Sequence, residues 1–103
     1  MARVSVEIKD HIAHVTLTRG DKMNALDDAM VKGILAAAQE VAASVARVVV
    51  LAGEGKSFCA GLDLMSFMQM GTVDPKAWLM ERSHQDANEM QEVSMAWRRL
   101  EIP

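Results

Sequence analysis

A segment rich in small residues, positions 51–64, is where this sequence could do chemistry. It reads Leu-Ala-Gly-Glu-Gly-Lys-Ser-Phe-Cys-Ala-Gly-Leu-Asp-Leu, and an apolar run at residues 48–51, expected to be a buried strand, leads into it. Its three glycines and two alanines would let a ligand approach the backbone closely. Backbone N–H groups at a strand-to-helix turn can hold a phosphate or a transient oxyanion. The segment therefore predicts an anion-binding site made by the main chain.

Two nucleotide-binding motifs do not fit the segment. A P-loop needs a glycine five residues before the glycine of Gly-Lys-Ser at 55–57, and that position is Val50. A dinucleotide fingerprint that starts at the Gly-Glu-Gly of 53–55 needs its third glycine where the sequence has Phe58. Neither nucleotide class is favoured.

An oxyanion site is the alternative that the spacing allows. In Ala60-Gly-Leu-Asp63 a glycine stands just before a short predicted helix, so the N–H of Leu62 would be one of the unpaired donors at the helix start. Such a donor could point at a carbonyl oxygen that becomes negative during a reaction. Spacing alone favours a plainer interpretation, a glycine turn with Asp63 as a carboxylate at a helix start.

Hydrophobic periodicity predicts the elements that must position this segment. We expect strands at residues 4–8, 13–17 and 47–52, and helices at 28–43, 62–70 and from Asp74-Pro75 to near Pro103. Asp10-His11 is a plausible tight turn between the first two strands, and Asp27 can cap the first helix. The third strand is apolar on both faces. Strand–helix–strand order predicts a crossover connection and a mixed sheet covered by helices.

The two longer helices each carry an apolar stripe at helical spacing. The first stripe consists of Met30, Ile34, Ala37, Val41 and Val45. The second consists of Met80, Ser83, Ala87, Met90, Val93, Trp97 and Leu100. Glu81, Glu89 and Glu92 are most simply the solvated face of the last helix, and His11 and His14 read as surface residues of the first hairpin.

Composition excludes several classes of protein. A chain of 103 residues with half its residues hydrophobic fits one domain. A net charge of −3 and the lack of a basic cluster argue against nucleic acid as a partner. No apolar run approaches a membrane span, the start lacks a signal-peptide core, and no His, Cys and carboxylate spacing suggests a metal. Cys59 is the single cysteine and reads as a packing residue, and the cytoplasm is the expected location.

Two motifs together resemble one known family. Residues 19–26, Arg-Gly-Asp-Lys-Met-Asn-Ala-Leu, are similar to the pattern Arg-Pro-x-x-x-Asn-Ala-Leu. Residues 51–64 resemble Leu-x-Gly-x-Gly-x-x-Phe-x-Ala-Gly-x-Asp-Leu nearly position by position. Both patterns belong to the crotonase superfamily, also called the enoyl-CoA hydratase/isomerase family. The one departure in the first motif is Gly20, where proline is usual.

The resemblance implies a site for acyl-CoA thioesters, in which two backbone N–H groups hold the thioester oxygen as an enolate forms. Leu62 matches the residue whose amide is the first donor. The positions that match coenzyme A contacts are Lys22, Met23, Ala25, Ala60, Gly61 and Asp63. Lys22 is also well explained as a solvated loop lysine. Coenzyme A would enter as part of the substrate, with no separate cofactor.

The resemblance also implies the fold, an α/β crotonase-like (ClpP/crotonase) spiral of β-β-α units. Residues 1–103 would be the N-terminal part of a single such domain, with its C-terminal half absent. In the family the second oxyanion donor and the acid/base carboxylates come from that half, so we expect this chain alone to be inactive. Family members are usually trimers or pairs of trimers, which implies a homo-oligomer.

The function implied for the parent enzyme is hydration or double-bond isomerisation of a fatty enoyl-CoA. One alternative is a non-catalytic fragment or assembly module that binds coenzyme A without turnover. Another is a different reaction on the same scaffold, such as thioester hydrolysis, dehalogenation or decarboxylation.

Overall fold

The first two strands form a hairpin, as their alternating residues predict. In the computed structural model, which describes residues 3–61 and 89–103, β1 (Val4–Lys9) pairs antiparallel with β2 (Ile12–Leu17). Asp10 and His11 join them with φ angles of 53° and 65°. Positive φ at both central residues is what a type I′ hairpin turn requires, and Asp is among the residues that tolerate it. The predicted tight turn is confirmed.

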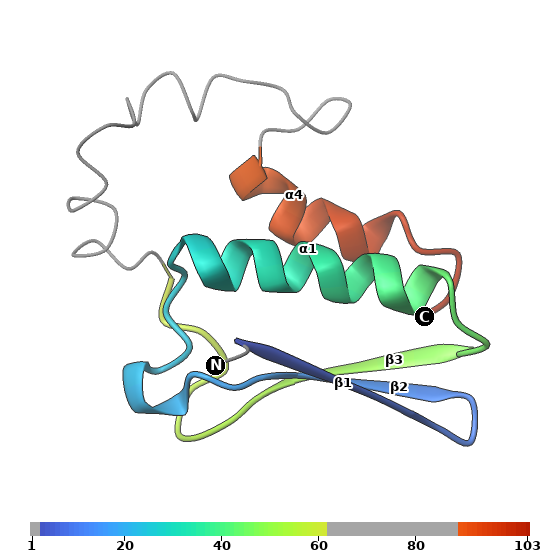
Figure 1. The fold of residues 1–103 in the computed structure, drawn as a ribbon, viewed down its shortest axis with the longest axis horizontal. Helices are drawn as coiled ribbons and strands as arrows, with labels where there is room; N and C mark the ends of the chain where they lie inside the picture. The colour runs from blue at the N-terminus through green and yellow to red at the C-terminus, as the bar shows by residue number, and fades with distance from the viewer. Residues whose placement is uncertain (1–2, 62–88) are drawn as a thin grey trace.

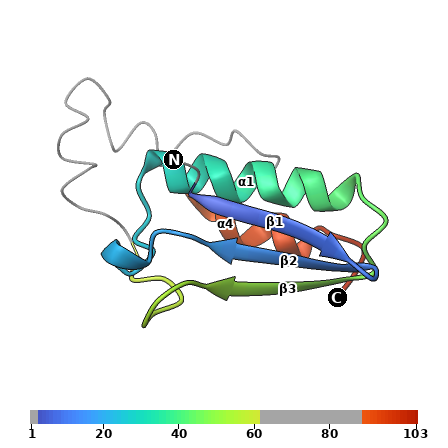
Figure 2. The same ribbon diagram turned by 60° about the horizontal axis from the view of Figure 1, so that its bottom comes forward.

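The sheet is mixed, and its helices lie on one face (Figures 1 and 2). After β2 come a 3-10 turn (Gly20–Lys22), α1 (Asp28–Ala42), β3 (Val48–Gly53) and α4 (Glu89–Arg98). The strand order is β1-β2-β3, and β3 runs parallel to β2 with Ile12 opposite Val48 and Leu17 opposite Gly53. A parallel pair needs a crossover, and α1 supplies it across the face that the apolar residues share.

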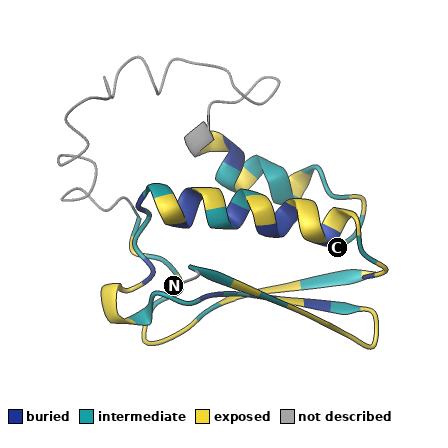
Figure 3. Cartoon of the chain, in the orientation of Figure 1, coloured by how far each residue is buried: buried dark blue, intermediate teal, exposed yellow. Residues whose placement is uncertain are grey.

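Alternation along β2 decides which face is covered. Ala13, Val15 and Leu17 are buried beneath the helices, whereas His14 points to the opposite face and is exposed. His11 is exposed as well, so both histidines lie at the surface as predicted. The core is therefore a single layer between the sheet and the two helices (Figure 3).

Helix α1 forms as predicted, with one error at its end. Asp27 caps it, because its Oδ1 accepts a hydrogen bond of 2.7 Å from the N–H of Met30. The buried residues of α1 include four members of the predicted stripe, Met30, Ile34, Ala37 and Val41. Val45 was predicted to continue this stripe, and that is wrong. The helix ends at Ala42, which leaves Val45 in the turn before β3 with 73% of its surface exposed.

Strand β3 is more open than its sequence predicts. Val50 and Leu51 are 45% and 37% exposed, although we expected the run to be buried. In the part of the sheet that the structure describes, β3 is an outer strand, so one of its edges has no neighbouring strand. The carbonyl of Pro103 meets the strand there, accepting a hydrogen bond of 2.8 Å from the N–H of Val49.

Helix α4 packs on α1 through the last part of its predicted stripe. Val93 and Trp97 pack against the buried residues of α1 and β2, and Leu100 follows just after the helix. Glu92 was predicted to be solvated, and that is wrong: it is only 6% exposed and pairs with Arg99. Its position on α4 faces α1, in a cavity that Ala38 and Gln39 also line. The predicted helix at 62–70 and the start of the long helix, with Met80, Ser83 and Ala87, lie outside the described residues.

Candidate functional site

The two motifs lie side by side because the strands before them are parallel. Parallel strands end at the same edge of a sheet, so the loop after β2 (residues 18–27) and the loop after β3 (residues 54–61) start next to each other. We call these two loops the paired loops. Two backbone hydrogen bonds join them: the N–H of Ala60 donates to the carbonyl of Met23 at 2.9 Å, and the N–H of Leu26 donates to the carbonyl of Gly61 at 2.6 Å.

A fully buried amide, Asn24, fastens the paired loops from inside. Its Oδ1 accepts from the N–H of Arg19 at 2.8 Å, and its Nδ2 donates to the carbonyls of Glu54 and Ser57, both at 2.9 Å. Asn24 is 0% exposed and has a φ of 54°, a left-handed conformation that asparagine adopts more readily than most residues. Sequence reasoning assigned no role to Asn24. From sequence alone, a polar residue in a turn is expected to be solvated, and only the position of the second loop shows that Asn24 is buried.

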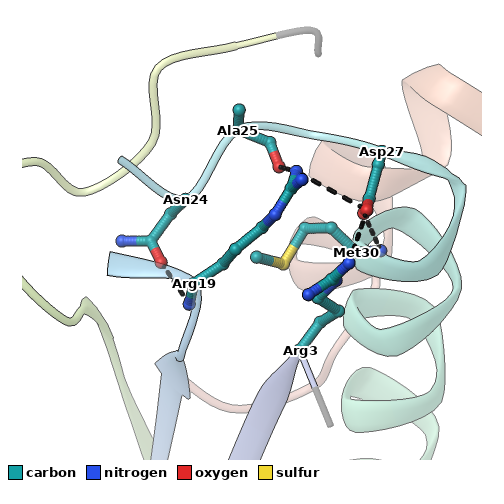
Figure 4. Close-up of polar contacts among 6 residues, drawn as sticks. All are labelled: Arg3, Arg19, Asn24, Ala25, Asp27 and Met30. Carbon is teal, nitrogen blue, oxygen red and sulfur yellow. Dashed lines mark hydrogen bonds and ion pairs between the residues drawn. The ribbon is translucent and has the colours of Figure 1, made fainter. Parts of the chain in front are cut away.

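Asp27 and two arginines tie the first of the paired loops to the helix and to the start of the sheet (Figure 4). Arg19 Nη1 donates to the carbonyl of Ala25 at 3.1 Å and lies 3.5 Å from Asp27 Oδ2. Arg3 Nη2 donates to the same carboxylate oxygen at 2.9 Å. The side chains of Arg19 and Asp27 are only 11% and 10% exposed, so water screens this pair weakly. The loop is thereby fixed at both ends.

Glycines allow the paired loops to pack backbone against backbone. A Cβ at Gly53 would lie 2.6 Å from the carbonyl oxygen of Phe58, and a Cβ at Gly20 would lie 3.0 Å from that of Glu54. Gly55 adopts a φ of 87°, which favours glycine, and its own Cβ position lies 3.2 Å from the Cα of Gly20. Gly20, where the family pattern has proline, is therefore in close contact with the neighbouring loop.

The described site residues predicted from the motifs come together at this edge. The main chain of Met23 pairs with that of Ala60, and Gly61 pairs with the residue that follows Ala25. Lys22, Met23 and Ala60 are exposed, so a ligand could reach them, whereas Ala25 and Gly61 are half-buried. Leu62 and Asp63 lie outside the described residues.

An apolar cavity of about 330 Å³ opens beneath the paired loops. Its lining consists of Leu17, Leu26, Ile34, Leu51, Phe58, Cys59, Val93, Ser94 and Trp97. Cys59 is half-buried there, next in sequence to Ala60. The arrangement places polar main chain at a rim and apolar side chains below it, which suits a ligand with a polar head and an apolar tail.

The described residues offer neither a metal-binding cluster nor a membrane-spanning helix. Residues 3–61 and 89–103 contain no cluster of three or more His, Cys, Asp or Glu side chains placed to hold a metal ion. Within the same residues no helix has the length and apolarity needed to span a membrane.

Comparison with known proteins identifies the family. The family model described as enoyl-CoA hydratase/isomerase matches residues 7–96. The chain therefore belongs to the enoyl-CoA hydratase/isomerase family, the crotonase superfamily. It is 44% identical over 61 residues to a "probable enoyl-CoA hydratase" of Rhodobacter capsulatus, a match that covers 59% of this chain and 23% of that protein.

Solved structures show that the fold is the crotonase fold. A "probable enoyl-CoA hydratase" from Mycobacterium thermoresistibile aligns with 100% of this chain at a TM-score of 0.80 and 26% identity. A "probable enoyl-CoA hydratase/isomerase" from Mycobacterium abscessus aligns with 67% of it at a TM-score of 0.63 and 34% identity. The chain spans 39% and 28% of the lengths of these two proteins, respectively.

Proposed function

We propose that the paired loops bind an acyl-CoA thioester, in an enzyme that hydrates a fatty enoyl-CoA or isomerises its double bond. Lys22, Met23, Ala25, Ala60, Gly61 and Asp63 would contact coenzyme A, and the amide of Leu62 would donate to the thioester oxygen. The observation that carries the proposal is the pairing of the two motifs: the bonds from Ala60 to Met23 and from Leu26 to Gly61 place segments far apart in sequence on one rim.

The chemistry that such a rim can supply is electrostatic. When a nucleophile adds to the β-carbon of an enoyl thioester, electrons move through the α-carbon and the thioester oxygen becomes negative. Main-chain donors aimed at that oxygen stabilise it, and removing one donor typically costs ~3–4 kcal/mol. The acyl chain would occupy the apolar cavity beneath, whose low polarity strengthens the interaction. The acid/base carboxylates and the second donor would belong to the part of the crotonase fold that this chain does not span.

Binding of coenzyme A is the direct test of this proposal. We expect isothermal titration calorimetry of the chain with crotonyl-CoA to give saturable binding. Lys22→Ala should weaken it about two- to fivefold, because an exposed lysine near a phosphate contributes a modest interaction. Crotonyl pantetheine, which lacks the nucleotide phosphates, should bind the unmodified chain and the Lys22→Ala variant with equal affinity.

Lys9 provides the matched control for Lys22. It is an exposed lysine at the hairpin end of the sheet, away from the paired loops. Lys9→Ala should leave the affinity for crotonyl-CoA unchanged. Absence of binding by the unmodified chain would overturn the proposal. If Lys22→Ala and Lys9→Ala weaken the affinity equally, Lys22 acts only through the net charge of the chain.

A further inference from the structure

Asn24 joins the paired loops through its side chain, although the motifs assign it no contact with a ligand. Each of its two amide protons has a candidate acceptor in the second loop, the carbonyls of Glu54 and Ser57 at 2.9 Å. Its oxygen accepts from the N–H of Arg19 in the first loop at 2.8 Å. One side chain thus holds both ends of the 54–57 turn against the start of the other loop.

The position of Asn24 excludes contact with a ligand. The residue is 0% exposed, so its side chain cannot reach a thioester or a phosphate from where it lies. Its neighbours Met23 and Ala25, by contrast, are exposed and half-buried. Any effect of Asn24 on binding must therefore pass through the residues that it holds in place.

The backbone bonds that join the two contact segments flank Asn24 closely. Met23, one residue before it, accepts from Ala60, and Leu26, two residues after it, donates to Gly61. Gly53 lies against the same amide, because a Cβ at this position would lie 2.9 Å from Asn24 Nδ2. The amide and the two backbone bonds form one continuous network between the loops.

We propose that Asn24 is a positioning residue for coenzyme A binding: its buried amide sets the placement of residues 60–61 relative to residues 22–25. This inference rests on the proposed function, because it takes these two segments as the coenzyme A contacts. Removing the amide leaves two carbonyls to find new partners, and the two segments then separate more often. The affinity falls although no contact with the ligand is deleted.

Two substitutions isolate the amide from the backbone conformation. Asn24→Gly keeps a residue that adopts positive φ without strain and removes all three hydrogen bonds. Asn24→Asp keeps the size and the acceptor for Arg19 but removes both protons given to Glu54 and Ser57. The matched control is Val41→Ala, a truncation at a buried residue of α1 that belongs to a different part of the core.

The test combines amide hydrogen exchange with coenzyme A affinity, both measured on the 103-residue chain at a temperature where circular dichroism shows every variant folded. We expect Asn24→Gly to speed exchange at Ala60 and Leu26 about tenfold relative to Val31, whose N–H donates to the carbonyl of Asp27 at the start of α1. Affinity for crotonyl-CoA should fall about tenfold as well. Asn24→Asp should lose affinity at neutral pH and recover part of it on acidification, because a neutral carboxyl can donate one hydrogen bond.

The control and the contrary outcomes separate positioning from general stability. Val41→Ala should lower the melting temperature without a selective change at Ala60 and Leu26 and without loss of affinity. Unchanged exchange at these two amides in Asn24→Gly, or an affinity loss no larger than that of Val41→Ala, would overturn the inference. If the unmodified chain does not bind crotonyl-CoA, the proposed function fails, while the exchange data still decide whether Asn24 positions the two segments.

Discussion

At the scale of single residues, Asp27 combines three interactions in one carboxylate. It accepts from the Met30 N–H as the cap of α1, and it lies 2.9 Å from Arg3 and 3.5 Å from Arg19. The sequence predicts only the first of these, because a cap is a local pattern. Arg3 approaches from just before β1 and Arg19 from the loop after β2, and no local pattern shows that they converge. Asp27 thus links a predictable helix start to the loop of the candidate site.

Replacing Asp27 should separate the cap from the ion pairs. We expect Asp27→Ala to lower the free energy of unfolding by about 2–3 kcal/mol, since it removes a helix cap together with weakly screened charge pairs. Asp27→Asn should cost only about 1 kcal/mol, because asparagine still caps a helix. Urea denaturation followed by circular dichroism measures both values.

Asp28 is the control for this prediction. It is next in sequence, and its pair with Lys32 at 3.5 Å joins side chains that are 44% and 62% exposed. Asp28→Ala should change stability by no more than about 0.5 kcal/mol. A loss in Asp27→Asn as large as that in Asp27→Ala would show that the charge, and not the cap, carries the effect.

At the scale of the elements, the sequence predicts the features that depend on residues close together in the chain. The hairpin, the start of α1 and most of its stripe follow from alternation and helical spacing. The errors depend on more than the local pattern: Val45 leaves the stripe because the helix stops at Ala42, and Val50 is exposed because it lies opposite His14, on the face of the sheet that the described helices do not cover. Glu92 is buried because α4 turns that face toward α1. The roles that the motifs assign to site residues stay predictions, whereas the contacts of Asn24 depend on a loop some thirty residues away, which no local pattern shows.

The Glu92–Arg99 pair joins α4 to the residue that follows it, and we expect it to stabilise this end of the chain. Arg99→Ala would leave a carboxylate that is 6% exposed without this partner. We expect a loss of about 2–3 kcal/mol, below the ~3–5 kcal/mol of a fully buried pair, because the Arg99 side chain is itself 25% exposed. The double variant Glu92→Met with Arg99→Leu should regain most of the stability, since it removes both charges. Unfolding in urea, followed by tryptophan fluorescence, measures these differences.

Arg98 is the matched control for Arg99. It is exposed at the end of α4, so Arg98→Ala should stay within about 0.5 kcal/mol of the unmodified chain. If Arg99→Ala lowers the free energy of unfolding no more than Arg98→Ala does, the pair does not contribute to stability.

At the scale of the whole molecule, the chain carries a recognisable part of a larger fold. It spans 39% of the solved structure from Mycobacterium thermoresistibile and aligns over all of its own residues. The paired loops nevertheless form within that part, because the four hydrogen bonds described above that join them lie between residues 23 and 61. The proposed binding rim and the proposed acid/base chemistry therefore belong to different parts of the fold, and they can be tested separately.

Binding without turnover is the outcome that this separation predicts. We expect the 103-residue chain to bind crotonyl-CoA in the calorimeter and to leave its enoyl absorbance unchanged over hours, because under the proposed function it would supply one oxyanion donor without the carboxylates that would activate water. A thiol reagent in a parallel assay detects free coenzyme A, and its release would favour thioester hydrolysis over hydration. Loss of enoyl absorbance that Asn24→Gly reduces would contradict the prediction, because the acid and base would then lie within these residues. Binding of crotonyl-CoA with no loss of enoyl absorbance and no release of free coenzyme A would mean that substrate recognition and catalysis are physically separable in this fold.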